Sequence, residues 1–126
     1  MKLSIVIPVY NESATLCQLV EKVCDATVKI SSQVDSFEIV MVDDCSNDGS
    51  RELLLERFSN RTNFKVLFQE FNQGKGAALY AGIAITDGDI VLIQDADLEY
   101  DLSDYPILLG PILSNMADVV YGSRFK

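Results

Sequence analysis

The chain has no histidine and no tryptophan, and only three cysteines and three prolines among its 126 residues. Without histidine, the common zinc sites and every catalytic triad that uses an imidazole are excluded. Cys17, Cys24 and Cys45 are odd in number and form no Cys-x-x-Cys pair, so we expect a reducing compartment and no disulfide framework. Any metal ion must then be held by oxygen ligands, which favours Mg²⁺ or Mn²⁺.

Basic residues are also scarce, with 10 Lys and Arg against 19 Asp and Glu and a formal net charge of −9 at pH 7. Nucleic acids and anionic membranes are therefore disfavoured as partners, because binding to them depends on Lys and Arg neutralising phosphates. No apolar run approaches the ~20 residues that span a bilayer, and no secretory signal pattern follows Met1. We expect a cytoplasmic protein, peripheral to the cytoplasmic membrane in a longer form.

The order of apolar runs predicts one α/β domain over residues 1–126. Short runs of branched apolar residues predict strands at residues 3–9, 37–42, 64–68, 90–93 and 117–121. Helical spacing of apolar residues predicts helices at residues 16–28, 50–58, 76–85 and 101–114. This alternation predicts a mainly parallel, Rossmann-like sheet covered by helices on both faces, in three α/β/α layers.

Paired acidic residues follow the strand predicted at residues 90–93. Side chains alternate along a strand, so Asp95 and Asp97 project to the same side while Ala96 points away. Two like charges on one side repel each other unless a cation or a shared proton lies between them. We therefore predict a metal ion that holds a diphosphate at this position, and Glu99 shares that side if the chain stays extended.

Polar residues follow the other strands, and each has a functional and a plainer interpretation. Tyr10 and Glu12, after Pro8, can stack on a base and hold a ribose hydroxyl, or they simply form a strand-to-helix turn. Asp44 can accept a hydrogen bond from a nucleobase or from its own backbone. Arg124 can bind a phosphate in a bidentate manner or be a surface charge. Because ligands of parallel sheets bind beyond the carboxyl ends of the strands, we expect these groups to lie at one edge.

A glycine-rich segment, Gly74-x-Gly76-x-x-Leu79, is a weak match to a dinucleotide-binding fingerprint. Leu79 stands where a small residue is required, and the segment follows the third predicted strand instead of the first. The plainer interpretation is a tight turn followed by a small-residue helix that packs close to the sheet.

Taken together, the chain resembles glycosyltransferase family 2 of the GT-A fold, and most of all the polyprenyl- (dolichyl-) phosphate sugar transferases. The matching segments are residues 4–12, 38–50, 72–76, 95–99 and 119–125. The resemblance implies the nucleotide-diphospho-sugar transferase fold and the inverting, metal-assisted transfer of a sugar from a UDP- or GDP-linked donor. The acceptor would be a polyprenyl phosphate or a saccharide.

The resemblance also implies roles for individual residues. The nucleotide pocket would be formed by Pro8, Tyr10, Glu12, Val42 and Asp44. Asp95 and Asp97 would hold Mg²⁺ or Mn²⁺ on the donor diphosphate, with Ala96 lining the site and Glu99 nearby. Arg124 would contact the donor diphosphate or a lipid phosphate. Catalytic domains of this family are longer than this chain, so we expect an N-terminal part of one, with the catalytic base in the acceptor half.

Two alternatives remain open. The first is a module that binds nucleotide sugars without transferring them, in which an apolar surface exposed by the missing half drives self-association. The second is a signalling receiver domain, which requires its acidic pair after the first strand and a lysine after the fifth. Here the pair Asp43-Asp44 follows the second predicted strand, and Arg124 follows the fifth.

Overall fold

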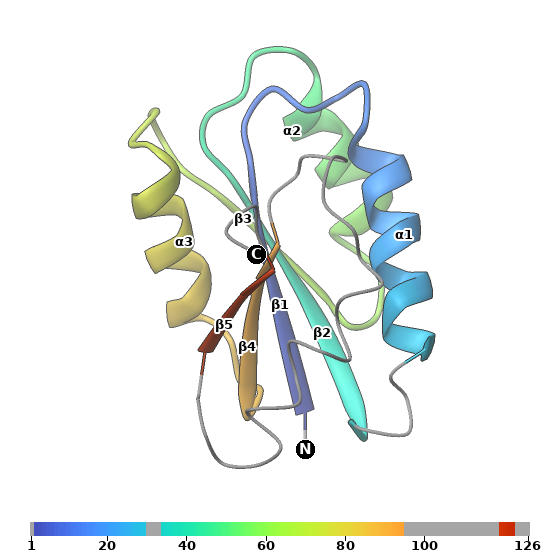
Figure 1. Ribbon diagram of the computed structural model, residues 1–126. Coiled ribbons are helices and arrows are strands. Elements are labelled where there is room, and N and C mark those ends of the chain that lie inside the picture. Colours follow the sequence, from blue (N-terminus) through green and yellow to red (C-terminus); the bar gives the residue numbers. More distant parts are fainter. Residues whose placement is uncertain (1, 30–33, 95–118, 123–126) are drawn as a thin grey trace.

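The computed structural model describes residues 2–29 and 34–94 and the backbone of residues 119–122 (Figure 1). Five strands form one parallel sheet in the order β3-β2-β1-β4-β5. They are β1 (Lys2–Val9), β2 (Ser36–Asp43), β3 (Phe64–Phe68), β4 (Ile90–Gln94) and β5 (Val119–Gly122). The α/β class and the mainly parallel sheet predicted from the sequence are confirmed.

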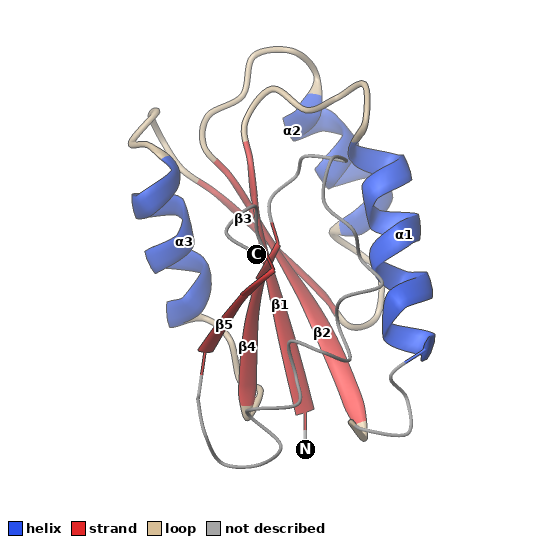
Figure 2. Ribbon diagram, viewed as in Figure 1, coloured by secondary structure: helices blue, strands red, loops and turns tan. Residues whose placement is uncertain are grey.

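Helices cover both faces of this sheet (Figure 2). On one face lie α1 (Leu16–Lys29) and α2 (Ser50–Leu53), and α2 continues directly into the π-helical turn η1 (Leu54–Phe58). On the other face lies α3 (Lys75–Ala84). The helix predicted at residues 101–114 lies outside the described residues. No helix in the described ranges is both long and apolar enough to span a membrane.

Two apolar cores result from the alternation of side chains along β1. Ile5 and Ile7 pack in the larger core with α1, Leu54 and Phe58. Val6 packs in the smaller core, on the α3 side. Because β1 has a strand on each side and helices over both faces, its side chains are buried from Leu3 to Val9, which explains an apolar run that only Ser4 interrupts.

Small residues bring α3 very close to the sheet. A Cβ atom added to Gly82 would lie 2.7 Å from Val6 Cγ1 and 2.9 Å from Val42 Cγ2, so only glycine fits at this contact. Ala78 is also fully buried against the sheet. The plainer interpretation of the glycine-rich segment, a small-residue helix packed on the sheet, is therefore the correct one.

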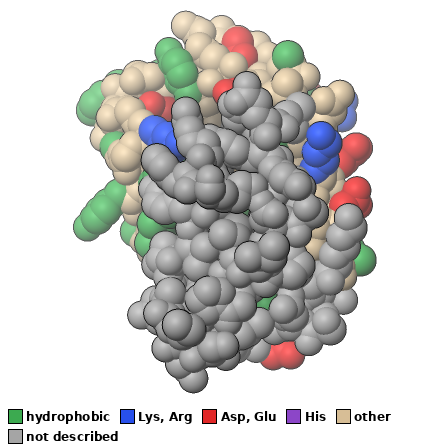
Figure 3. Space-filling view, viewed as in Figure 1, with side chains coloured by type: hydrophobic (Ala, Val, Ile, Leu, Met, Phe, Trp, Pro, Cys, Tyr) green, Lys and Arg blue, Asp and Glu red, His purple; other side chains and the backbone are tan. Residues whose placement is uncertain are grey.

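The outer side of α3 is apolar as well. Apart from Lys75 the helix contains no charged residue, yet Tyr80 is 80% exposed and Ile83 is 37% exposed. Phe71, in the connector before α3, is also exposed. Hydrophobic side chains project on this side of the molecule (Figure 3).

Two details of the described elements bear on their ends. The last apolar residue of α1, Val28, is 70% exposed, because the buried positions follow the helical period and end at Ala26 and Thr27. Strand β1 runs to Val9, which is its predicted end, and pairs with β2 along its whole length. The described pairing of β1 with β4 ends at Val6, so Pro8 lies past the part of β1 that is paired on both sides.

Strand β3 pairs with β2 alone among the described strands, and its side chains are half-buried. Cationic side chains cover its aromatic residues. The Arg61 guanidinium lies 4.5 Å from the centre of the Phe64 ring, and that of Arg51 lies 4.9 Å from the centre of the Phe68 ring. Lys65 occupies the strand between these two rings.

A buried carboxylate lies at the amino end of the sheet. Glu38 on β2 accepts hydrogen bonds through Oε2 from Ser4 Oγ (2.5 Å) and from the backbone N–H of Asp87 (2.8 Å). Its Oε1 lies 2.9 Å from Lys65 Nζ. Desolvation raises the pKa of Glu38, but the hydrogen bonds from Ser4, Asp87 and Lys65 outweigh it and hold the pKa below its usual value. This network joins β1, β2 and β3 to the turn before β4.

Candidate functional site

The connectors that follow β1, β2 and β3 meet at the carboxyl edge of the sheet, at the top of Figure 1. In the β1–β2 register Pro8 lies opposite Val42, and Val9 lies opposite Asp43. The structure therefore brings five predicted site residues to this edge: Pro8, Tyr10, Glu12, Val42 and Asp44. The other five, Asp95, Ala96, Asp97, Glu99 and Arg124, lie outside the described residues, so their roles stay predictions.

Asp44 joins the three connectors and is only 4% exposed. Its carboxylate accepts hydrogen bonds from the backbone N–H groups of Gln73 (Oδ1, 2.8 Å) and Gly74 (Oδ2, 2.9 Å). Its own N–H donates to the carbonyl of Val9 (2.8 Å). Gly74 adopts φ 96° and ψ 163°, a conformation open to glycine alone. A carboxylate has about four lone-pair positions, so two are left for a ligand.

The side chains of Asp43 and Asp44 lie on different faces of the sheet. Asp43 is fully buried, and its Oδ2 accepts a hydrogen bond from the N–H of Ser46 (3.0 Å) and lies 3.6 Å from an Arg51 guanidinium nitrogen. The same guanidinium nitrogen donates to the carbonyl of Gln69 (3.1 Å). Asp43 Oδ1 has no hydrogen-bond partner among the described residues. Asp43 thus anchors the turn into α2, while Asp44 holds the turn into α3.

The connectors after β1 and β2 are also joined directly. Asn11 donates its backbone N–H to Ser46 Oγ (2.9 Å), and its Oδ1 accepts from the N–H of Asn47 (2.9 Å). Asn11 has φ 52°, in the left-handed region that asparagine tolerates better than most residues. No role was predicted for Asn11 from the sequence, although asparagine next to a strand end is typical of a turn with unusual backbone angles.

Tyr10 and Val42 offer different surfaces to a ligand. The Tyr10 side chain is 48% exposed, so a large part of its surface is open to solvent. Val42 is fully buried against Val6 and Ala78 under α3. Val42 therefore forms the floor of this edge, and Tyr10 lies at its surface.

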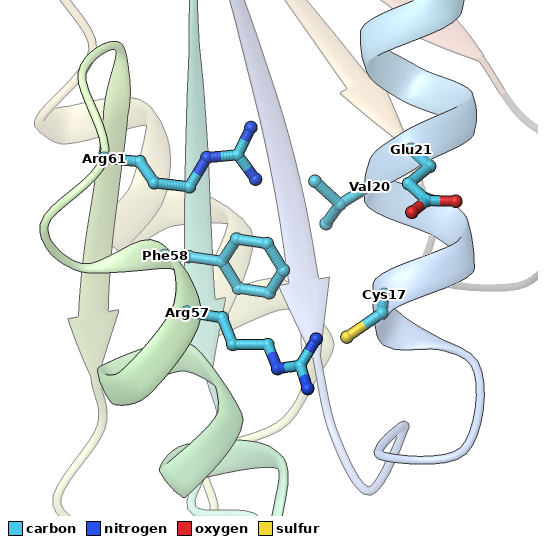
Figure 4. Close-up of a pocket in the computed structure, with 6 residues that line it drawn as sticks. All are labelled: Cys17, Val20, Glu21, Arg57, Phe58 and Arg61. Carbon is cyan, nitrogen blue, oxygen red and sulfur yellow. The ribbon is translucent and has the colours of Figure 1, made fainter.

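A separate groove lies between α1 and η1, away from the carboxyl edge (Figure 4). It has a volume of about 330 Å³ and is lined by Cys17, Val20, Glu21, Arg57, Phe58 and Arg61. Cys24 lines an adjoining depression. Burial raises the pKa of the Cys24 thiol despite the opposing effect of Arg61, so this thiol is a poor nucleophile. The groove contains none of the predicted site residues.

The residues predicted to hold a metal ion lie outside the described residues. Within the described ranges no group of three or more His, Cys, Asp or Glu side chains is placed to hold a metal ion. The predicted ligands Asp95, Asp97 and Glu99 offer carboxylate oxygens only, and this donor set suits Mg²⁺ or Mn²⁺.

We expect Asp44→Asn to lower the free energy of unfolding by about 1 kcal/mol, because an amide nitrogen would face a backbone N–H donor that needs an acceptor. Urea denaturation of the two proteins measures this difference. Glu56→Gln, an exposed change of the same kind on η1, serves as the control and should leave the midpoint unchanged. An unchanged midpoint for Asp44→Asn would show that the Gln73–Gly74 turn forms without this carboxylate.

Comparison with known proteins identifies the family. The model of glycosyl transferase family 2 matches residues 4–126. The chain is 37% identical over 111 residues to the undecaprenyl-phosphate 4-deoxy-4-formamido-L-arabinose transferase of Proteus mirabilis, covering 86% of this chain and 33% of that relative. It is 35% identical over 128 residues to the dolichyl-phosphate beta-glucosyltransferase ALG5A of Trichomonas vaginalis, covering 97% of this chain and 40% of that relative.

A solved structure shows the same architecture. The crystal structure of GalNAc-T7 with UDP, GalNAc and Mn²⁺ superposes with a TM-score of 0.73 and 29% identity, over 91% of this chain and 21% of that one. The chain thus spans between a third and two fifths of the length of the two relatives described above. The resemblance inferred from the motifs and the GT-A fold are confirmed, and the chain belongs to glycosyltransferase family 2.

Proposed function

We propose that this protein binds a nucleotide-diphosphate sugar at the carboxyl edge of its sheet and transfers the sugar, with inversion, to a polyprenyl phosphate or a saccharide. One observation carries the proposal: the connectors after β1, β2 and β3 converge on Asp44 at that edge. In an open parallel sheet this is the place where ligands bind. The relatives are named as transferases to undecaprenyl and dolichyl phosphates, which supports the acceptor class.

The nucleotide end of the donor would lie against β1 and β2. Tyr10 offers an exposed ring for stacking on the base, and Asp44 keeps two acceptor positions for a base N–H. Glu12 would accept from a ribose hydroxyl. Pro8 and Val42 would line the bottom of the nucleotide pocket. UDP in the crystal structure of GalNAc-T7 supports a nucleoside diphosphate as the ligand.

The diphosphate would lie near the end of β4. There Asp95 and Asp97 would hold Mg²⁺ or Mn²⁺, with Ala96 lining the site and Glu99 nearby, and Arg124 would contact a phosphate. A divalent cation at this point stabilises the negative charge that the leaving diphosphate gains. A polyprenyl phosphate acceptor is already an oxyanion and requires no general base, whereas a sugar hydroxyl requires a carboxylate.

Donor binding without transfer is the second candidate. It is supported by the described carboxyl edge, which holds groups proposed for the donor. The residues proposed for the donor are all present, while no group for activating an acceptor is assigned. An apolar surface such as that of Phe71, Tyr80 and Ile83 would then favour self-association.

A thermal titration tests the proposal. We expect UDP or GDP with Mn²⁺ to raise the melting temperature, since a ligand at 100 times its Kd stabilises a protein by about 2.7 kcal/mol. Asp97→Ala should remove the Mn²⁺-dependent part of this rise and weaken nucleotide affinity at least tenfold, as one carboxylate ligand is lost. Transfer from labelled UDP-glucose or GDP-mannose to polyprenyl phosphate then separates the transferase from the binding module.

The matched control is Asp104→Ala, which removes a nearby acidic residue that has no proposed role. It should retain the full response to Mn²⁺. A wild-type chain whose melting temperature does not change with any nucleotide and Mn²⁺ would overturn the proposal.

A further inference from the structure

Asp48, in the connector between β2 and α2, accepts three hydrogen bonds at the carboxyl edge. Its Oδ2 accepts from the backbone N–H of Ser13 (3.0 Å). Its Oδ1 accepts from the backbone N–H (3.0 Å) and from the hydroxyl (2.7 Å) of Ser50. Ser13 lies in the connector after β1, 35 positions away along the chain, so this carboxylate joins two loops that only the fold brings together.

Asp48 is also connected to Glu12, through the hydroxyl group of Ser50. The Ser50 side chain is fully buried, and its Oγ accepts a hydrogen bond from the backbone N–H of Glu12 (2.9 Å). Since its hydroxyl proton is donated to Asp48, its oxygen is left to accept from Glu12. One carboxylate therefore fixes two successive amides: that of Ser13 directly, and that of Glu12 through Ser50.

The same hydrogen bonds stabilise the negative charge of the Asp48 carboxylate. Partial desolvation raises its pKa, but the hydrogen bonds from Ser50 and Ser13 outweigh this effect and lower the pKa to about 2. The carboxylate is therefore ionised at neutral pH, and its hydrogen bonds are charge-assisted.

The segment that Asp48 holds is the one that carries Tyr10 and Glu12. This segment follows the end of β1, so no strand ladder fixes its backbone. Asn11, Glu12 and Ser13 tether it by hydrogen bonds to the β2–α2 connector and to Ser50. The Glu12 carbonyl also accepts from the amides of Thr15 and Leu16. A ligand-binding segment that is already held in place loses less conformational entropy on binding.

We propose that Asp48 is a positioning residue for the donor nucleotide, holding the β1 connector through Ser50 and Ser13 so that Tyr10 and Glu12 face the nucleotide. The inference rests on the proposed function and extends it to a residue outside the proposed ligand contacts. Asp48 acts through the backbone of its neighbours, and its own side chain does not touch the donor.

Nucleotide affinity of Asp48 variants tests the inference. We expect Asp48→Ala to weaken UDP binding in the presence of Mn²⁺ by about tenfold, measured by calorimetry well below the melting temperature. The Glu12 and Ser13 amides should exchange their hydrogens faster in this variant. Asp48→Asn keeps an acceptor for Ser50 but turns an amide nitrogen toward the Ser13 N–H, so we expect a loss of about threefold.

The double variant Asp48→Ala/Ser50→Ala shows whether the effect passes through Ser50. If it does, the double variant binds more tightly than the product of the two single losses predicts. If the two losses of UDP affinity simply multiply, Asp48 does not act through Ser50. Ser4→Ala is the matched control, because it removes a buried hydroxyl of the Glu38 network at the opposite edge. It should lower the melting temperature without changing the Kd for UDP.

The outcomes distinguish this inference from the proposed function. If the wild-type chain binds no nucleotide, both are overturned. If it binds UDP and Asp48→Ala binds within twofold of it, only the positioning role is overturned. If Ser4→Ala weakens binding as much as Asp48→Ala does, general destabilisation accounts for the loss and the positioning role is again overturned.

Discussion

Lys65→Met is expected to lower the free energy of unfolding at pH 7 by about 3 kcal/mol. The substitution keeps most of the side-chain length but leaves Glu38, only 2% exposed, with a buried charge that lacks its cation. Breaking a buried ion pair by removing one partner costs about 3–5 kcal/mol, and water reaching the partly exposed Lys65 position places the effect at the lower end. Urea denaturation at pH 7 measures it.

The pH dependence of this difference provides a second check. In the wild-type protein the folded-state pKa of Glu38 is lowered, so its contribution to stability is present above the ordinary glutamate value of about 4.3 and is lost as the pH falls through the folded-state pKa. Without Lys65, burial raises the pKa instead, and the variant gains stability as Glu38 is protonated. The difference between the two proteins should therefore shrink below about pH 5.

Lys22→Met on α1 removes the same charge at an exposed position and serves as the control. It should leave the denaturation midpoint nearly unchanged at both pH values. A Lys65→Met protein as stable as the control would show that the Glu38 charge is already compensated by Ser4 and the Asp87 amide.

Gly82→Ala is expected to lower the free energy of unfolding by about 2 kcal/mol, which corresponds to roughly 5–10 °C in melting temperature. The added methyl group would lie 2.7 Å from Val6 Cγ1 and 2.9 Å from Val42 Cγ2, so α3 must move away from the sheet. Both valines are fully buried in the core under α3 and have no free space into which they can turn. Thermal denaturation followed by circular dichroism measures the change.

The same helix provides the matched control. A Cβ atom added to Gly76 meets nothing within 4 Å, so Gly76→Ala should raise stability by about 0.5–1 kcal/mol through helix propensity alone. In a Val6→Ala background, Gly82→Ala should cost less, because the closest methyl group is gone. Equal effects of the two glycine substitutions would contradict the close contact between α3 and the sheet.

Much of this architecture could be predicted from the sequence because its signals are local. The run at residues 64–68 became β3 with the same limits, and the first two strands differ from their predicted bounds by one residue at each shifted end. Fully buried parallel strands are uninterrupted apolar runs, and this is the clearest pattern a sequence contains. The chemistry of the carboxyl edge followed from topology, since parallel strands place their ends together.

What the sequence did not predict depends on contacts between distant residues. Nothing local distinguishes Asp44, which receives the amides of Gln73 and Gly74, from Asp43, which faces Ser46 and Arg51. The buried network of Glu38 could not be predicted either, because its partners come from β1, β3 and the turn before β4. Asp48 lies among turn-forming residues at positions 46–50, and this local pattern accounts only for its bond to Ser50.

The described edge of the sheet has a consequence for the protein in concentrated solution. A strand at the edge of a sheet has free backbone N–H and C=O groups that can pair with another chain, and such pairing leads to aggregation or domain swapping. In β3 the positive charge of Lys65 stands in the middle of the strand, and the guanidinium groups of Arg61 and Arg51 cover the Phe64 and Phe68 rings. Positive charges on and beside a strand at the edge of a sheet disfavour its pairing with a second copy of the chain.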